Sequence, residues 1–187
     1  MTDEAVEHCR AFLEALGLSD EDDAELQRTP ERVTELMQHL FEGVGEPGPQ
    51  MSTFPNEEGI EDPVLLLDIP FHSTCVHHLV PFFGHVDVAY VPGDVVAGFG
   101  SFGRVVDHFA RRPQIQERML AQIADHLVDQ LAPRGLLVRC RARQMCVELR
   151  DTGARGTFVS VESRGVLSSG ELREEAMAQF LSAESSP

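Results

Sequence analysis

The chain has 187 residues, of which 42% are apolar and 25% are charged, as in an ordinary globular domain with a buried core. Its formal net charge is −16, and it contains no lysine. Acids outnumber arginines by 20 to 3 over residues 1–103, whereas beyond residue 103 the counts are 11 and 12. We therefore expect no binding to nucleic acid or to anionic membranes. Any anionic ligand must be held by arginine, histidine, backbone N–H groups or a metal ion.

We expect neither a transmembrane helix nor a secretory signal. No run approaches the ~20 apolar residues of a transmembrane helix, and the opening MTDEAVEHCR is acidic, unlike the basic start of a secretory signal. The four cysteines, Cys9, Cys75, Cys140 and Cys146, are too few and too scattered for a disulfide framework. We expect a cytoplasmic protein in which a cysteine close to histidines is a metal ligand.

Residues 1–63 are predicted to form an N-terminal helical region followed by an acidic loop. Apolar residues recur at helical spacing over residues 3–17, and Gly17 ends that helix. Residues 19–23 are acidic and predict a solvated turn or a helix start. A second helix is predicted with Thr29 as N-cap and Pro30 as the first helical residue, continuing to Gly43. Residues 44–63 are rich in proline, glycine and acids, and they predict a loop or hinge.

Residues 64–187 are predicted to form the second and larger domain. Alternating, β-branched segments predict four strands, at residues 64–74, 85–92, 136–149 and 156–165. Between the second and third strands, Gln114 to Leu131 is a long amphipathic helix, and residues 171–183 form a final short helix. This order predicts an α+β fold in which an antiparallel sheet packs on helices.

The segment HSTCVHHLVPFFGHV, residues 72–86, gathers one cysteine and four histidines. Cys75 and His78 have the C-x-x-H spacing of a local zinc site, and a turn before the break at residues 81–84 would bring them together. His77 would then lie next to a ligand without binding the metal, placed to move protons. The alternative is a buried cysteine with hydrogen-bonded histidines and no metal.

A third ligand must come from elsewhere in the chain. On the predicted strand 136–149, Cys146 shares a face with Cys140, and Arg139, Arg141 and Arg143 occupy the other face. We predict Cys146 as the third ligand, although Cys140 satisfies the same alternation. Two cysteines and one histidine leave a fourth zinc position for water, as in catalytic rather than structural sites.

Four segments together resemble GTP cyclohydrolase I: RTPERVTELMQHLFEG, STCVHHLVPFFGHVDVAYVP, GFGSFGRVVDHFARRPQIQERMLAQIADHL and RQMC. The resemblance covers about residues 28–165, in the family's order and with near-identical spacing. It implies a tunnelling fold (T-fold), in which a four-stranded antiparallel sheet is backed by helices. It also implies a toroidal homo-oligomer, usually a decamer of two stacked pentamers, with active sites between subunits.

The implied reaction opens the guanine imidazole ring of GTP with zinc-activated water, releases formate and forms dihydroneopterin triphosphate. The positions that match the family's motifs are the zinc ligands Cys75, His78 and Cys146, the acid/base residue His77, the guanine-binding Glu117 with Gln116 next to it, and the triphosphate-binding Arg104, Arg150 and Arg32, the last from a neighbouring subunit. Without the motif, Glu117 and Gln116 would also suit the first turn of a helix, and the arginines a solvated surface.

Five positions depart from the family's pattern. Val76 replaces a glutamate, Gly100 a serine, and Glu35 a lysine. Ser101 replaces a phosphate-binding lysine and is predicted to contact the substrate. Gln144 replaces a histidine two residues before the last cysteine. On a regular strand Gln144 would lie about 7 Å from that cysteine, bordering the metal, but an amide cannot shuttle protons.

Three hypotheses follow. The first is a zinc-dependent GTP cyclohydrolase I that carries out the full reaction. The second is a diverged cyclohydrolase that stops at a ring-opened formamidopyrimidine, or that acts on a less phosphorylated purine or another heterocycle in specialised metabolism. The third is a non-catalytic, zinc-stabilised subunit that binds a purine or a partner.

Overall fold

The computed structural model describes residues 3–18, 23–150 and 155–183, and the chain divides into two compact units, residues 1–42 and 43–187. The boundary follows the second helix, so the predicted loop 44–63 belongs to the larger unit. The functional division predicted at residue 64 stays a prediction. No helix within the described ranges combines the length and apolar character needed to cross a membrane.

The smaller unit contains α1 (Asp3–Ala15) and α2 (Thr29–Leu40). The predicted stop after α1 is confirmed, because Gly17 has a φ of +80° and donates its N–H to the Glu14 carbonyl. The prediction of Thr29 as N-cap is wrong. The first helical bond runs from the Arg32 N–H to the Arg28 carbonyl, so Arg28 is the N-cap and Thr29 is already helical.

The end of α2 and the acidic segment also need correction. The helix ends at Leu40, short of the predicted Gly43, because the Phe41 N–H already bonds back to the Gln38 carbonyl. Of the acidic segment, only Asp23 lies within the described residues. Its carboxylate accepts a hydrogen bond from the Glu25 N–H and caps the 3-10 helix η1 (Ala24–Leu26).

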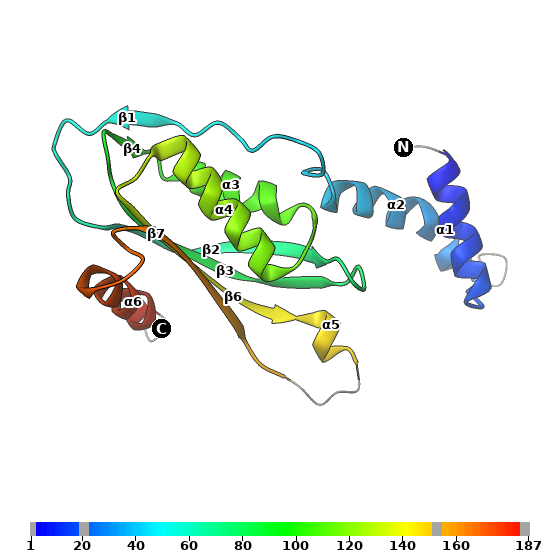
Figure 1. Ribbon diagram of the computed structural model, residues 1–187. Coiled ribbons are helices and arrows are strands. Elements are labelled where there is room, and N and C mark those ends of the chain that lie inside the picture. The colour runs from blue at the N-terminus through cyan, green and yellow to red at the C-terminus, as the bar shows by residue number, and fades with distance from the viewer. Residues whose placement is uncertain (1–2, 19–22, 151–154, 184–187) are drawn as a thin grey trace. The chain divides into compact units, whose positions relative to one another are not determined.

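The larger unit is an α+β structure built on one main sheet (Figure 1). The elements in chain order are β1 (Thr53–Pro55), β2 (Val64–Cys75), β3 (Pro81–Val91), β4 (Val95–Ala97), α3 (Gly100–Ala110), β5 (Pro113–Gln114), α4 (Gln116–Leu131), β6 (Gly135–Gln144), α5 (Met145–Glu148), β7 (Phe158–Gly165) and α6 (Glu171–Ala183). The main sheet has the order β5-β2-β3-β6-β7, and a second, two-stranded sheet pairs β1 with β4.

The four predicted strands correspond to β2, β3, β6 and β7, which form antiparallel pairs in that order. The prediction of four strands is incomplete, because β5 adds a short parallel edge and β1 and β4 pair separately. β3 also starts earlier than predicted. Residues 81–84 are not a break, since they pair with β2 on one side and, from Phe82, with β6 on the other. The helix α3 was not predicted.

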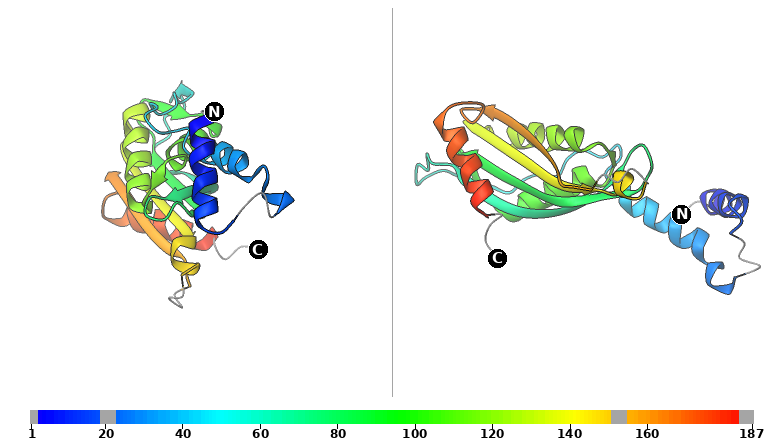
Figure 2. Two further views of the ribbon diagram at one scale, coloured as in Figure 1. Left: turned by 90° about the vertical axis from the view of Figure 1, so that its right-hand side faces the viewer. Right: turned by 90° about the horizontal axis from the view of Figure 1, so that it is seen from below.

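Helices α3 and α4 cover one face of the sheet, and α6 lies against the other (Figures 1 and 2). The buried side of α4 consists of Gln116, Met119, Leu120, Ile123, Ala124, Leu127 and Leu131. Each large apolar side chain among them contributes about 1.5–3 kcal/mol when it is buried. They meet the inward side chains of β6, Leu136, Val138, Cys140 and Ala142, so the predicted inward face of that strand is confirmed.

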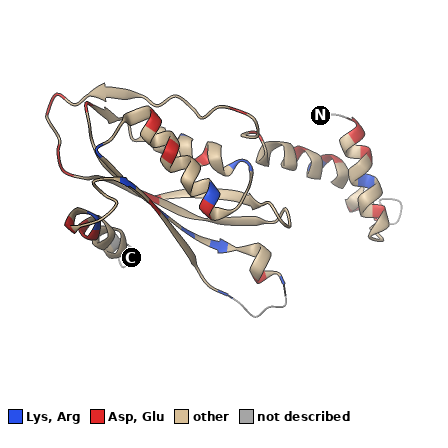
Figure 3. Ribbon diagram, in the orientation of Figure 1, with Lys and Arg blue, Asp and Glu red and all other residues tan. Residues whose placement is uncertain are grey.

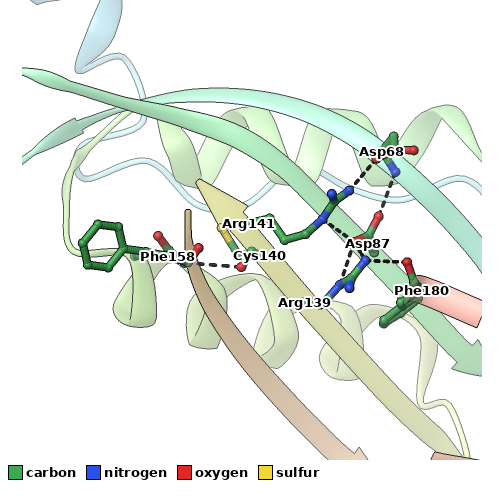
Figure 4. A network of polar contacts seen from close by, with 8 residues as sticks. Asp68, Asp87, Arg139, Cys140, Arg141, Phe158 and Phe180 are labelled. Atoms are coloured by element: carbon green, nitrogen blue, oxygen red, sulfur yellow. Dashed lines mark hydrogen bonds and ion pairs between the residues drawn. The ribbon is translucent and has the colours of Figure 1, made fainter. Parts of the chain in front are cut away.

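Two of the three arginines on the outer face of β6, Arg139 and Arg141, belong to a polar network that Figure 4 shows, whereas Arg143 is exposed. Arg139 is 2% exposed and forms a 2.8 Å ion pair with Asp87, which is 1% exposed. Its guanidinium also donates to the Phe180 carbonyl of α6, at 2.8 Å, and lies over the Phe180 ring. Arg141 extends the network to Asp68, whose φ of +56° lies within an irregularity of β2. The arginine face therefore anchors α6.

Candidate metal centre

A tight turn between β2 and β3 brings Cys75 and His78 together. The Cys75 N–H donates to the Val80 carbonyl, and the Leu79 N–H donates to the Cys75 carbonyl, both at 2.9 Å. Leu79 has a φ of +53°, a left-handed conformation that costs a non-glycine residue roughly 1–2 kcal/mol. The predicted turn is confirmed, and the reversal places the His78 side chain near the Cys75 thiol.

Cys146 lies on α5, the short helix that follows β6, rather than on a strand. The β6–β7 ladder ends at Ala142, and the β3–β6 ladder ends at Gln144. Beyond Gln144 no described strand continues the pairing, so the backbone bonds locally, and the Leu149 N–H donates to the Met145 carbonyl. The prediction that residues 136–149 form one regular strand is therefore wrong at its end, and the predicted 7 Å spacing is replaced by a helical turn.

One atom from each of Cys75, His78 and Cys146 lies within 4.8 Å of the other two. Cys140, the alternative ligand, is not part of this group. It is fully buried in the core, where burial raises the pKa of its thiol to about 12. Of the two cysteines that the strand pattern left open, the folded chain therefore brings Cys146 to the other ligands.

The donor set fits zinc. Zinc–sulfur and zinc–nitrogen bonds of about 2.3 and 2.1 Å put tetrahedral ligand atoms roughly 3.5–3.8 Å apart, so small side-chain rotations suffice. Burial and a hydrogen bond with Cys75 raise the pKa of the Cys146 thiol, and the charge of Arg150 lowers it. Cysteine binds zinc as thiolate, so metal binding here is coupled to the release of protons. Cys75 is buried but His78 is exposed, so the group borders solvent.

His77 and Val76 occupy the same turn. The His77 Nδ1 lies 3.7 Å from the Cys75 Sγ, and the imidazole is exposed, a position suited to proton exchange with solvent. Val76 is 38% exposed and lines a cavity of about 420 Å³ together with Arg112 and Arg118. A valine at this position therefore places no carboxylate next to those two arginines.

Two glutamine side chains connect the metal centre to the sheet. Gln116, the first residue of α4, is 4% exposed, and its Nε2 lies 3.3 Å from the Cys140 carbonyl and 3.2 Å from the Phe158 carbonyl. Its Oε1 accepts from the Gln144 Nε2 at 2.8 Å. Ser160, which was not predicted as a site residue, places its Oγ 3.0 Å from the Gln116 Nε2. The alternation of β7 and its pairing with Cys140 would have indicated Ser160.

The GTP cyclohydrolase I family model matches residues 5–181 of this chain. A GTP cyclohydrolase 1 of Lysinibacillus sphaericus is 38% identical over 177 residues, covering 94% of this chain and 93% of that protein. The corresponding proteins of Carboxydothermus hydrogenoformans and Streptococcus mutans are 40% and 42% identical, each covering 90% of this chain and 89% of the relative. The chain belongs to the GTP cyclohydrolase I family.

A solved structure, the archaeosine synthase QueF-Like in the apo form, aligns with a TM-score of 0.41 and 18% identity. The alignment covers 54% of this chain and 93% of that chain, and the similarity is too low to carry an argument.

For the GTP cyclohydrolase I family, the resemblance placed triphosphate-binding arginines at three positions. Arg104 is exposed and bonds to the first turn of its own helix, through the Gly100 carbonyl at 3.3 Å and the Ser101 Oγ at 3.0 Å. Arg150 is exposed just after α5, and its charge opposes the rise in the pKa of the Cys146 thiol that burial causes. Arg32 is exposed on α2 in the smaller unit, and its place at the site stays a prediction, as does that of Glu35.

Ser101 has a structural partner. It is 2% exposed, and its Oγ accepts a hydrogen bond from the Ser52 N–H at 3.0 Å in addition to that from Arg104. Within a single chain the hydroxyl therefore joins α3 to the segment before β1, and its contact with substrate stays a prediction. Glu117, in contrast, is exposed, and its charge contributes to raising the pKa of the Cys140 thiol on β6; its contact with substrate stays a prediction.

Proposed function

We propose that this protein is a zinc-dependent GTP cyclohydrolase I, which opens the guanine imidazole ring of GTP, releases formate and forms dihydroneopterin triphosphate. The observation that carries the proposal is the convergence of Cys75, His78 and Cys146, three ligands suited to zinc, from two separate turns of the chain. Family membership supports GTP as the substrate. A zinc ion held by these ligands would supply Lewis-acid activation of water.

The remaining groups act on the substrate. His77 lies next to Cys75 and is exposed, so we infer that it moves protons to and from the opening ring. The Glu117 carboxylate can accept two N–H bonds from the guanine edge. Arg150 and Arg104 supply the positive charge that a triphosphate requires in a chain with no lysine. Figure 3 shows arginines along β6 and around the start of α4, whereas the charged residues of α1 and α2 are mostly acids.

A second candidate is a diverged cyclohydrolase, and Gln144 is the observation that favours it. An amide neither gains nor loses a proton near neutral pH, so this position cannot relay protons. Such an enzyme would stop at a ring-opened formamidopyrimidine, or would act on a less phosphorylated purine or another heterocycle. The buried Ser101 also fits a weaker hold on the triphosphate.

We also propose the T-fold and the toroidal homo-oligomer of the family, with Arg32 reaching the site from a neighbouring subunit. The main sheet supports this assembly. β7 pairs only with β6, leaving one edge without a strand among the described residues, and Phe158 and Val159 on β7 are 45% and 57% exposed. Ten subunits and a cytoplasmic location stay predictions.

The test is to load the protein with zinc, incubate it with GTP, GMP and guanosine, and identify the products by mass and ultraviolet spectrum. The full reaction gives formate and a pterin from GTP, and the second candidate gives a formamidopyrimidine or prefers another substrate. Stoichiometric zinc without turnover of any guanine derivative would contradict both and leave a binding subunit. Gln144→His tests whether the missing proton relay at this position limits the reaction. If the variant forms pterin at the same rate as the wild type, the amide does not limit it.

A further inference from the structure

The buried side chain of Gln116 fixes which way its own amide points. Its terminal nitrogen position faces two main-chain carbonyls, those of Cys140 at 3.3 Å and Phe158 at 3.2 Å. Carbonyl oxygens only accept hydrogen bonds, so the group facing them must be the NH₂. The opposite orientation would turn the Gln116 Oε1 to these two carbonyl oxygens, so that acceptors would face one another around a side chain that is only 4% exposed.

The orientation of Gln116 then determines that of Gln144. With its NH₂ turned to the sheet, Gln116 presents its Oε1 to Gln144 at 2.8 Å, and this oxygen needs a donor. Gln144 can supply one only through its Nε2. Its own Oε1 must therefore point away from Gln116, and it accepts a weak hydrogen bond from the Cys146 thiol, with Sγ and Oε1 3.9 Å apart. That donor is lost when the cysteine binds a metal as thiolate.

We propose that Gln116 is a positioning residue that, through Gln144, holds a hydrogen-bond acceptor against the Cys75–His78–Cys146 group. The proposal rests on the proposed function and deepens it. The Gln144 oxygen accepts a hydrogen bond from an O–H or N–H donor of the reacting species, either the attacking water or the substrate. It supplies no proton and does not titrate. Ser160 supports the arrangement by contacting the Gln116 Nε2 at 3.0 Å.

A double-mutant cycle with Gln116→Met and Gln144→Met tests this dependence, because methionine keeps the length of the side chain and removes its polar atoms. We expect Gln116→Met alone to lower kcat/KM for GTP about tenfold, the effect of one misplaced hydrogen bond. In the Gln144→Met background the same change should alter kcat/KM less than about twofold. A loss confined to kcat identifies water as the donor, and a raised KM identifies the substrate.

Two further measurements make the test independent of folding and of turnover. The unfolding midpoints in urea of the four metal-free proteins should be non-additive, because both single variants break the same bond. Ser160→Ala should give a smaller loss of kcat/KM than Gln116→Met, with the fold intact. Gln179→Met, which changes an exposed glutamine on α6, is the matched control and should leave both readouts unchanged.

Equal effects of Gln116→Met in both Gln144 backgrounds, or additive unfolding midpoints, would overturn the proposal. Absence of turnover by the wild-type protein would instead overturn the proposed function. In that case the unfolding cycle still decides whether Gln116 orients Gln144.

Discussion

Cys140 and Cys146 both fitted the strand pattern as the third metal ligand. Replacing each one separately by serine should show which of them binds the metal and which stabilises the fold. In Cys146→Ser the centre loses one of its three ligands, and we expect zinc affinity to fall by more than about 100-fold, because outer partners of zinc ligands alone contribute about 10–100-fold. The metal-free fold should change little, since Cys146 is only partly buried, in the short helix α5.

Cys140→Ser should behave in the opposite way. Cys140 is 0% exposed among Val86, Val138 and Ala142, so serine would place a hydroxyl in an apolar environment. We expect the free energy of unfolding of the metal-free protein to fall by about 1–3 kcal/mol, with zinc affinity unchanged. Zinc affinity is measured by competition with a chromogenic chelator, and stability by urea unfolding. If Cys140→Ser lost zinc while Cys146→Ser kept it, the assignment of the ligands would be wrong.

Three further predictions concern the sheet, the titration of a histidine and the substrate. Arg139→Met should lower the free energy of unfolding by about 3 kcal/mol, because it leaves the Asp87 carboxylate buried without its main partner; urea unfolding measures this, and a change under 1 kcal/mol would contradict it. Burial, and then the charge of Arg112, lower the pKa of His108, so His108 binds a proton more readily in the unfolded chain than in the folded protein. The free energy of unfolding should therefore fall as the pH drops below about 6.5. Urea unfolding at several pH values measures this dependence, and His108→Phe should make it weaker. Arg150→Ala should weaken GTP binding at least about tenfold, while guanosine binding stays within twofold. Calorimetry measures both affinities. Equal losses for the two ligands would show that Arg150 does not contact phosphate.

The sequence pattern predicted the structure correctly where residues close in sequence are also close in space. The turn that joins Cys75 to His78 needs only the hairpin β2–β3, and the alternation of β6 places Cys140 inward whichever strands flank it. The final helix has the predicted bounds, Glu171–Ala183. The resemblance to the family, carried by short motifs, is confirmed by matches along nearly the whole chain.

The sequence pattern did not predict the structure where contacts with residues distant in sequence determine the backbone conformation or the burial of a side chain. Helix α3 contains Gly100 and Gly103, which weaken helical propensity, yet it forms because Phe102, Val105, Val106 and Phe109 pack under the sheet. Arg139 is buried although its side chain is charged, because α6 packs over it and the Phe180 carbonyl accepts a hydrogen bond from its guanidinium.

The sequence by itself determined the α+β class, the alternation of the main strands and which residue types were available to bind zinc. Only the tertiary structure decided between Cys140 and Cys146, because the strand ends where β3 and β7 stop pairing with it and the chain then turns toward Cys75. The orientation of the Gln144 amide was likewise beyond the sequence. It depends on two carbonyls of β6 and β7 that meet the side chain of α4 only after the sheet and helix have packed.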